Sequence, residues 1–450
     1  MNELLIKDGL IIPVADGARV LRNKSIIIAG NRISEIGPTT ELLARYPQAH
    51  ILDASHHAVL PGIVNAHTHV VPTILLRGLT EDHLDSFYGV SLPMKEAITP
   101  ETVYTVSKLG CAEMIAAGST CISEIWHHME QTARAVDDAG LRGVLAHKVK
   151  EVDLGQVLKG QYEFDTREGE ERLAANVELV KKWHRGAGER ITCRIGPHAA
   201  DTCSPELLKK ARAAADDLGV GIHINVAQSP EEVSRINDLT GKGSVEFLAD
   251  LGFLDDKVLA AHLVYISDSE IEILKESGSY MAHCPGVMAR RVRFAPVGKI
   301  YGAGVRVALG NGWMNMDPWD NMRMAIAGAR ITTGDVDVLS PYQVLRMATS
   351  SAAEALGLGN EIGSLEPGKK ADIILIDMAS PHFYPHHERF DLIATLVYNA
   401  TGNDVSTVIV DGKILMEDRE LISLDLEEVM HEAETASQRL WRRVVREKKS

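Results

Sequence analysis

Two histidines that are one residue apart, His67 and His69, are the first feature of this sequence that could do chemistry. They follow an apolar segment, 59–64, which has the composition of a buried strand. Residues two apart in an extended chain point to the same side, so both imidazoles can reach one ion. Because imidazole nitrogens are common zinc ligands, the pair predicts a metal site at the end of this strand.

Polar side chains follow seven further apolar segments in the same way. Any one of them could be an ordinary surface or hydrogen-bonded residue, but their recurrence after every apolar segment predicts a shared site. The segments are 121–123, 143–146, 191–195, 220–224, 258–261, 280–282 and 305–309, and the polar residues are Glu124, His127, His128, His147, Lys148, His198, His223, Asn225, Gln228, His262, His283 and Asn311.

Helical stretches such as 205–218 separate these apolar segments. Alternation of strands and helices predicts a parallel sheet. Eight such units over residues 57–365 favour a closed (β/α)8 barrel of the TIM type over an open sheet. In such a barrel the catalytic residues lie at the carboxyl ends of the strands, where the polar residues above fall.

Both ends of the chain are rich in short β-strands. The segments 4–6, 10–12, 25–28 and 32–33 read as strands, and so do 371–376 and 406–413. Turn residues at Asp8-Gly9 and Gly30-Asn31 predict β-hairpins. We therefore expect residues 1–56 and 366–450 to form one small composite β-sandwich with a C-terminal helix.

The composition indicates a globular protein. Of 450 residues 45% are hydrophobic, and the net charge of −15 disfavours nucleic acid or an anionic membrane as a partner. The five cysteines form no C-x-x-C pair, which favours reduced, buried thiols in a cytoplasmic protein. Neither a signal peptide nor a membrane-spanning segment is predicted.

Longer motifs resemble those of the amidohydrolase superfamily. Within it, the chain is most similar to the branch of S-adenosylhomocysteine and methylthioadenosine deaminases and s-triazine hydrolases such as atrazine chlorohydrolase. The matching segments are Pro-Gly-Ile-Val-Asn-Ala-His-Thr-His at 61–69, 197–199 with 202–208, 261–262 with 267–268, 282–285, and 363–372. The resemblance covers nearly the whole chain and implies one divalent metal ion, usually zinc or iron, and a homodimer or homotetramer.

The resemblance also implies roles for individual residues. In the family the metal is held by the strand-one His pair, a strand-five His and a strand-eight Asp, while a strand-five Glu shuttles protons and a strand-six His holds the water. His67, His69 and His262 keep their family types. Asn225 replaces the strand-five His, Gln228 replaces the Glu, and Asn311 stands nearest the Asp.

These three replacements weaken a deaminase mechanism. Asparagine is a neutral oxygen donor, and glutamine cannot carry a proton. Two repairs remain open: Asn225 coordinates the metal with His262 as a third imidazole, or His223 reaches the metal. We expect His67, His69, Asn225 and His262 as metal ligands and His262, Gln228 and Asn311 as catalytic residues, with Glu124, His127, His128 and His147 as candidates for an extra carboxylate or base.

The substrate pocket also departs from the family. Family members often carry a Trp-Pro pair with a nearby Glu where this chain has Ser-Leu-Pro-Met-Lys at 91–95. Arg290 and Arg291 follow the strand-seven motif and could bind a carboxylate or phosphate, or pair with acidic surface groups. We expect His198, His283, Arg290 and Arg291 to contact the substrate.

Two functions are consistent with these residues. The first is a metal-dependent hydrolase that cleaves a C–N or related C–X bond of a small nitrogen-containing substrate, with zinc as the expected ion and iron, manganese or cobalt as alternatives. An amide, carbamate, urea or haloheterocycle suits Gln228 better than an aminopurine. The second is a non-hydrolytic member of the family with a binding or regulatory role.

Overall fold

The computed structural model describes residues 3–15, 20–80, 84–157, 159–313, 316–385, 387 and 389–447, with the backbone alone at 84–89, 96 and 446–447. All of the predicted site residues lie within these ranges. Met314 and Asn315, in the loop that follows strand eight of the sequence prediction, lie outside them.

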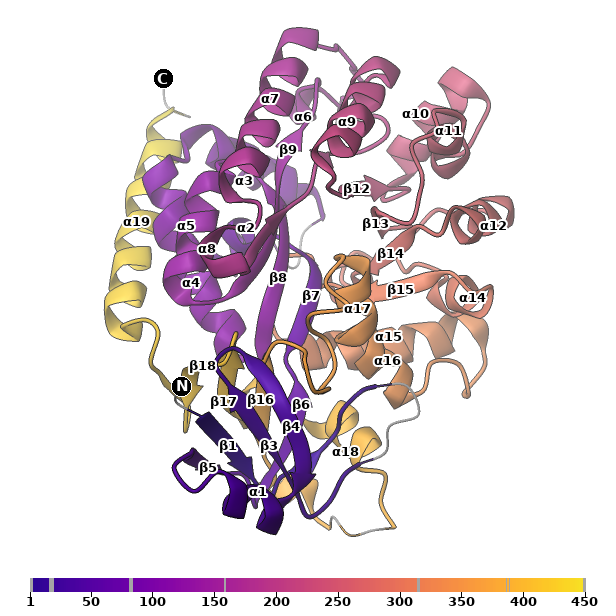
Figure 1. The fold of residues 1–450 in the computed structure, drawn as a ribbon. Helices are drawn as coiled ribbons and strands as arrows, with labels where there is room; N and C mark the ends of the chain where they lie inside the picture. The colour runs from indigo at the N-terminus through magenta and orange to yellow at the C-terminus, as the bar shows by residue number, and fades with distance from the viewer. Residues whose placement is uncertain are drawn as a thin grey trace.

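Eight buried parallel strand–helix units form the larger part of the molecule (Figure 1). Two sheets, β7-β8-β9-β10 and β12-β13-β14-β15, are joined at one seam by the bridges Ile195–Ile222 and Ala199–Asn225, and at the other by Thr68–Gly312. The strands therefore follow one another in the order predicted for a TIM-type barrel, but isolated bridges replace continuous ladders at both seams, so among the described residues the two sheets do not close into one continuously paired barrel. Their bounds are β7 (Ile63–Thr68), β8 (Ser119–Trp126), β9 (Arg142–Val149), β10 (Ile191–Cys193) with β11 (Gly196–Pro197), β12 (Ile222–Val226), β13 (Val258–His262), β14 (Tyr280–His283) and β15 (Arg306–Leu309).

Helices between the strands cover the outside of the two sheets. The predicted helix 205–218 is confirmed: it begins after Ser204, whose Oγ accepts a hydrogen bond from the Leu207 N–H, and ends at Gly219 with φ +69°. The longer helices are α2 (Val70–Leu76), α3 (Leu84–Ala97), α4 (Pro100–Ala116), α5 (Met129–Ala139), α7 (Thr166–Trp183), α9 (Pro205–Leu218), α10 (Pro230–Thr240), α11 (Ser244–Asp250), α12 (Asp268–Ser277), α15 (Pro318–Thr333), α16 (Pro341–Met347), α18 (Leu392–Asn399) and α19 (Leu426–Glu447).

The backbone after β15 lies directly against the histidine-bearing strand β7. The Gly312 N–H donates to the His67 carbonyl at 2.9 Å, and the His69 N–H donates to the Gly312 carbonyl at 2.7 Å. A Cβ at Gly310 would lie 2.7 Å from the His67 carbonyl oxygen, so this approach needs glycine. These two hydrogen bonds therefore fix the backbone position of both His67 and His69.

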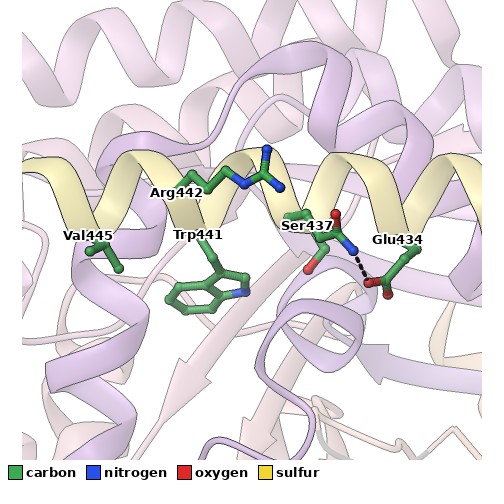
Figure 2. Close-up of a pocket in the computed structure, with 6 residues that line it drawn as sticks. Glu434, Ser437, Trp441, Arg442 and Val445 are labelled. Atoms are coloured by element: carbon green, nitrogen blue, oxygen red, sulfur yellow. Dashed lines mark hydrogen bonds between the residues drawn. The ribbon is translucent and has the colours of Figure 1, made fainter.

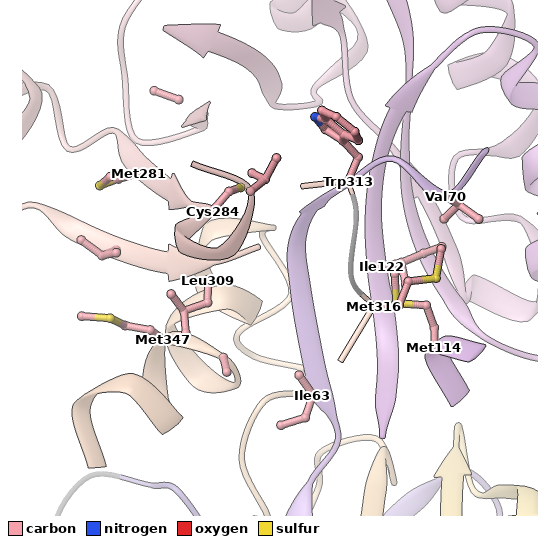
Figure 3. Close-up of a cluster of buried hydrophobic side chains, with 14 of the residues drawn as sticks. Ile63, Val70, Met114, Ile122, Met281, Cys284, Leu309, Trp313, Met316 and Met347 are labelled. Carbon is pink, nitrogen blue, oxygen red and sulfur yellow. The ribbon is translucent and has the colours of Figure 1, made fainter. Parts of the chain in front are cut away.

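A buried apolar cluster lies beside the strand that carries Ile63, β7 (Figure 3). Val70, Met114, Ile122 and Met316 meet there, joining α2 and α4 to β8. Gly110 allows the close contact, since a Cβ at this position would lie 2.1 Å from Val70 Cγ1. All five cysteines are free and buried, in agreement with the sequence prediction.

The two chain ends form two further sheets. One has the order β4-β3-β1-β5 and the other β19-β18-β17-β16-β6-β2. Apolar side chains of both sheets, among them Ile26 and Ile373, belong to one buried cluster. The strands are β1 (Glu3–Lys7), β2 (Leu10–Ile11), β3 (Lys24–Ala29), β4 (Arg32–Pro38), β5 (His50–Asp53), β6 (His57–Pro61), β16 (Ile373–Asp377), β17 (Val405–Val410), β18 (Lys413–Glu417) and β19 (Glu420–Leu421).

One of the two predicted hairpins is wrong. Gly30-Asn31 does join the paired strands β3 and β4. The strands on either side of Asp8-Gly9, however, enter different sheets: β1 pairs with β3 and β5, whereas β2 pairs with β6. Gly9 lies so close to β6 that a Cβ would be 2.4 Å from Val59 Cγ2, which places the turn between the sheets.

The C-terminal helix α19 packs on α3 and α4 rather than on the small sheets (Figure 1). Lys108 Nζ forms an ion pair with Glu432 at 3.1 Å, and Arg443 donates to the Ala97 carbonyl at 3.3 Å. Across the described part of the chain, none of the helices has the length and apolar character needed to cross a membrane.

Candidate active centre

Four imidazoles from β7, β12 and β13 lie close together: His67, His69 and His262 stand at or just after the carboxyl ends of β7 and β13, whereas His223 is the second residue of β12. The ring centroid of His67 lies 4.7 Å from that of His69, 4.9 Å from that of His223 and 5.0 Å from that of His262. All four residues are buried. The prediction that His67, His69 and His262 share one place is therefore consistent with the geometry, and His223 joins them.

His67 is held by a chain of hydrogen bonds rather than standing alone. Its Nδ1 lies 2.7 Å from His223 Nε2, and His223 Nδ1 lies 3.3 Å from Ser123 Oγ. When Ser123 accepts from His223, the His67 Nδ1–H donates to His223. In that arrangement the lone pair on His67 Nε2 is available to a ligand.

His69 is oriented by a carboxylate. Its Nδ1 lies 3.3 Å from Glu124 Oε1, while Glu124 Oε2 accepts a 2.6 Å hydrogen bond from the Val70 N–H. Burial raises the pKa of Glu124 to about 8, although the Val70 N–H and the Lys148 charge act in the opposite direction. When Glu124 is ionised, its carboxylate accepts the His69 Nδ1–H and so fixes the ring and its tautomer, as in many metal sites.

The imidazoles of the centre are neutral bases at physiological pH. Burial is the largest cause that lowers the pKa of His67, His69 and His262 well below its usual value, and the neighbouring histidines act in the same direction. A neutral imidazole is the form that can bind a metal or accept a proton.

The three residues that depart from the family occupy the expected strand ends. Asn225 is buried, and its Nδ2 donates to the His198 carbonyl at 2.9 Å. Asn311 is buried at the β7 seam, where its N–H donates to Asn65 Oδ1 at 3.0 Å. Gln228 follows β12 and is half-buried, and its N–H donates to Glu232 at 3.0 Å.

The donors of the centre can be tested for their fit to a divalent ion. His67 Nε2 and Asn225 Oδ1 are buried and have no hydrogen-bond partner among the described residues. Within the same residues, no three His, Cys, Asp or Glu side chains are arranged to hold a metal. Because an amide oxygen is a weaker ligand than imidazole or carboxylate, a set completed by Asn225 would hold an ion only loosely.

The predicted substrate residues lie around this centre at different depths. His198 Nδ1 lies 2.9 Å from Thr202 Oγ1, and the buried His283 packs on Phe294 with ring centroids 5.2 Å apart. Arg290 is exposed and lines, together with Asn311, a cavity of about 240 Å³. The Arg291 guanidinium lies over the Trp313 ring, 4.7 Å from its centroid.

Sequence reasoning missed the surroundings of Trp126. Its ring centroid lies 5.4 Å from that of His69, and the ammonium groups of Lys95 and Lys148 approach the indole at 4.9 and 4.5 Å. Lys148 directly follows His147 at the end of β9, so a lysine in a strand-end segment was the available signal.

The hollow on α19 shown in Figure 2 is not part of this centre. It measures about 600 Å³, and its lining residues Glu434, Ser437, Gln438, Trp441, Arg442 and Val445 all belong to α19. None of them is a histidine, cysteine or lysine, and Glu434 is occupied by a hydrogen bond from Gln438 at 2.6 Å.

Comparison with known proteins gives a consistent result. The model of the amidohydrolase family matches residues 58–415. The chain is 40% identical to a 5-methylthioadenosine/S-adenosylhomocysteine deaminase of Moorella thermoacetica, over 95% of this chain and 97% of the relative. It is 37% identical to a 5'-deoxyadenosine deaminase of Methanosarcina mazei, over 99% and 100% of the two chains.

Solved structures agree with the sequence relatives. A zinc-bound adenosine deaminase from Xanthomonas campestris superposes with a TM-score of 0.89 at 27% identity, covering 98% of both chains. A zinc complex of atrazine chlorohydrolase from Arthrobacter aurescens, at 22% identity and TM-score 0.86 over 96% of this chain and all of the other, shares the fold. The predicted enzyme class, a hydrolase of carbon–nitrogen bonds other than peptide bonds, is confirmed, and the chain belongs to the amidohydrolase family.

Proposed function

We propose that this chain is a metal-dependent hydrolase that cleaves a C–N, or related C–X, bond of a small nitrogen-containing heterocycle. In this proposal His67, His69 and Asn225, with His262 beside them, hold one divalent ion per chain. Zinc is the first choice because two zinc-bound structures share this fold, with iron, manganese and cobalt as alternatives. Such an ion would ionise a bound water and polarise the scissile bond.

Two buried polar atoms without a hydrogen-bond partner support this proposal. His67 Nε2 and Asn225 Oδ1 are buried polar atoms without a hydrogen-bond partner among the described residues, and they belong to residues expected as ligands. Burying a polar atom without a partner costs roughly 1–3 kcal/mol, so a ligand at this point would recover that energy.

The proposed catalytic residues do not include a proton carrier at the strand-five end. Gln228 and Asn311 can orient a water or substrate through hydrogen bonds, while His262, a buried neutral imidazole, can accept a proton. Ammonia needs protonation before it leaves. A substrate whose leaving group departs as a stable anion, such as the halide of a haloheterocycle, therefore suits this centre better than an aminopurine, whereas an amide or urea would still need a proton for its leaving amine.

Two measurements test the proposal. Elemental analysis of the purified protein should find a divalent metal, and activity should rise when zinc, iron, manganese or cobalt is added. Adenosine and 6-chloropurine riboside form a matched pair that differs only in the leaving group. We expect the chloride to be displaced at least about 100-fold faster, since general acid catalysis is worth roughly 10²–10⁴-fold. Protein without metal that gains no activity from any of the four ions would contradict the proposal.

A binding or regulatory protein is the second candidate. It is favoured by the lack of three strong ligands in one place among the described residues. The triple variant N225H/Q228E/N311D separates the two functions. Deaminase activity that appears where none existed supports the binding protein, whereas loss of a native activity supports a specialised enzyme.

The remaining expectations stay proposals. We assign residues 1–56 and 366–450 to a composite β-sandwich, supported by the apolar cluster that its two sheets share, and 57–365 to the catalytic barrel. The substrate is a small molecule that contacts His198, His283, Arg290 and Arg291. We expect a cytoplasmic homodimer or homotetramer that binds neither nucleic acid nor membranes.

A further inference from the structure

A cavity lies at the opposite end of the parallel strands from the histidine centre. It measures about 480 Å³ and is lined by the first residue of β9 and by residues that directly precede β12 and β13, Gly221 and Lys257. Thr192 of β10, the adjacent Arg194 and the end of α17 (Ser350–Ala355) also line it. Because the expected ligands of β7 and β13 stand at the carboxyl ends of their strands, this cavity is a separate site.

Arg194 brings a buried positive charge to this cavity. Its guanidinium donates to three backbone carbonyls, which belong to Ile222, Lys257 and Ala355. Arg194 is only 5% exposed, and among the described residues it forms no ion pair with a carboxylate. Asp255 acts on its charge, but this carboxylate pairs with Arg212 at 3.0 Å. A buried cation without a counter-ion is costly, and a bound anion would lower that cost.

Two further hydrogen-bond donors line the same cavity. Thr192 Oγ1 is buried and has no hydrogen-bond partner within the described part of the chain. His184 Nδ1 accepts a hydrogen bond from the Cys193 N–H at 3.1 Å, so the neutral ring carries its proton on Nε2. An oxyanion is the acceptor that a guanidinium, a hydroxyl and an imidazole N–H can share.

The remaining cations of the lining differ in whether they are already paired. Arg142 and Lys370 are buried and each has a carboxylate partner, at 2.9 and 3.4 Å. Lys257 and Arg185 are exposed and form no ion pair among the described residues. These two side chains therefore add positive charge that a ligand can use.

Four carboxylates line the cavity as well. Glu189 and Glu361 are paired with basic residues at 3.9 and 2.8 Å. Asp256 and Glu354 are exposed and, within the described residues, belong to no ion pair. Because carboxylates only accept hydrogen bonds, these two would repel a second anion but accept the hydroxyl groups of a ligand.

We propose that this cavity binds a small hydroxylated oxyanion, whose carboxylate or phosphoryl group contacts Arg194, Lys257 and Thr192. The hydroxyl groups of the ligand would donate to Asp256 and Glu354. The inference goes beyond the proposed function, since the cavity and the histidine centre lie at opposite ends of the strands. The cavity binds its ligand whether or not the histidine centre hydrolyses a substrate.

Equilibrium binding of three matched probes tests the inference. Glycerol 3-phosphate, glycerate and glycerol share a hydroxylated three-carbon chain and differ in the group at one end, and calorimetric titration of the purified protein measures each affinity. We expect at least one anion to bind about tenfold or more tightly than glycerol, since hydrogen bonds to charged groups are stronger than those between neutral groups. The tighter anion shows whether the ligand carries a phosphoryl group or a carboxylate.

Two substitutions locate the binding. K257M replaces an exposed ammonium by an apolar side chain of similar length, and T192V removes a hydroxyl that gives up no hydrogen bond within the described residues. Each should weaken anion binding by about fivefold or more. Arg194 is left in place, because its three carbonyl contacts join β10 to β12, β13 and α17. Two independent variants keep the test decisive if one of them does not fold, as judged by circular dichroism.

Two controls separate this site from the rest of the molecule. K181M removes an exposed lysine of α7 that pairs with Glu178, and H67Q alters the histidine centre. Both should keep the anion affinity within about twofold of that of the unaltered protein.

The outcomes are distinct from those that test the proposed function. Equal affinities for anion and glycerol, or an anion preference that survives both K257M and T192V, would overturn the inference. Loss of the preference in H67Q would move the anion to the histidine centre and overturn it as well. A preference that depends on Lys257 and Thr192, but not on His67, supports the site even in a protein that hydrolyses nothing.

Discussion

Asn225 is tied to the neighbouring strand end through one half of its amide only. Its Nδ2 donates to the His198 carbonyl at 2.9 Å, which turns Oδ1 away from that strand end. Oδ1 is buried without a hydrogen-bond partner among the described residues. This bond fixes which amide atom can serve a ligand, and it presents an oxygen at the position where the family resemblance predicts an imidazole nitrogen.

Replacing Asn225 by histidine should increase metal affinity. N225H adds a third strong ligand to His67 and His69, and we expect the dissociation constant for zinc to fall by at least about tenfold. Competition with a chromophoric chelator measures it, and N225A provides the comparison that removes the oxygen. If N225H and N225A bind zinc equally well, position 225 does not face the ion.

Loss of His67 should abolish both catalysis and metal binding at the centre while leaving the fold intact. H67Q removes the imidazole whose ring lies within 5.0 Å of those of His69, His223 and His262, so we expect activity to fall by more than about 100-fold and bound metal to be lost. Activity assays, metal analysis and thermal unfolding measure the three effects. H50Q is the matched control, since His50 is exposed on β5, and activity retained in H67Q would place the chemistry elsewhere.

Much of this centre could be predicted from the sequence because each part is local. A buried parallel strand followed by His67 and His69, or by His262, is recognised within about ten residues. The helix at 205–218 was predictable for the same reason: its N-cap, Ser204, and its C-terminal glycine, Gly219, directly flank its first and last residues.

What could not be predicted depends on which strands become neighbours. The contact of His67 with His223 joins β7 to β12 across the two sheets, and no local pattern encodes it. The convergence of Lys95 and Lys148 on Trp126 brings together α3, β9 and β8. Asp8-Gly9 has the composition of a hairpin turn, but the partners of β1 and β2 are chosen by distant strands.

The stability of the protein should fall in mild acid, and His147 should account for part of the loss. Burial, together with the charge of Arg172, lowers the pKa of His147 to about 4, below the value of 6.5 for an unfolded histidine. As pH falls from 6.5 to 4, the unfolded chain gains a proton at this histidine that the folded chain does not. The free energy of unfolding therefore decreases in that window. At pH 5 the loss is about 2 kcal/mol.

The variant H147N isolates this contribution from those of the other buried histidines. Urea unfolding at pH 7.5 and pH 5.0 should show a decrease in unfolding free energy that is smaller by about 2 kcal/mol in H147N than in the unaltered protein. H50N, at an exposed position, should keep the original pH dependence. The same decrease in H147N and the unaltered protein would show that His147 already carries its proton at pH 5.

The buried ion pair between Arg142 and Asp372 should be the most sensitive link between the barrel and the six-stranded sheet. Arg142, at the start of β9, donates from Nε and Nη2 to the two Asp372 oxygens, both at 2.9 Å, and both side chains are almost fully buried. The Asp411 N–H also donates to Asp372 at 2.9 Å. D372N removes the negative charge but keeps the shape, leaving the guanidinium buried with Asp411 as its remaining carboxylate partner at 3.4 Å.

We therefore expect the unfolding free energy of D372N to fall by about 3 kcal/mol, measured by urea unfolding at pH 7.5. E178Q breaks the exposed pair with Lys181 and should cost less than about 1 kcal/mol. Equal costs for the two variants would show that Asp411 alone compensates Arg142.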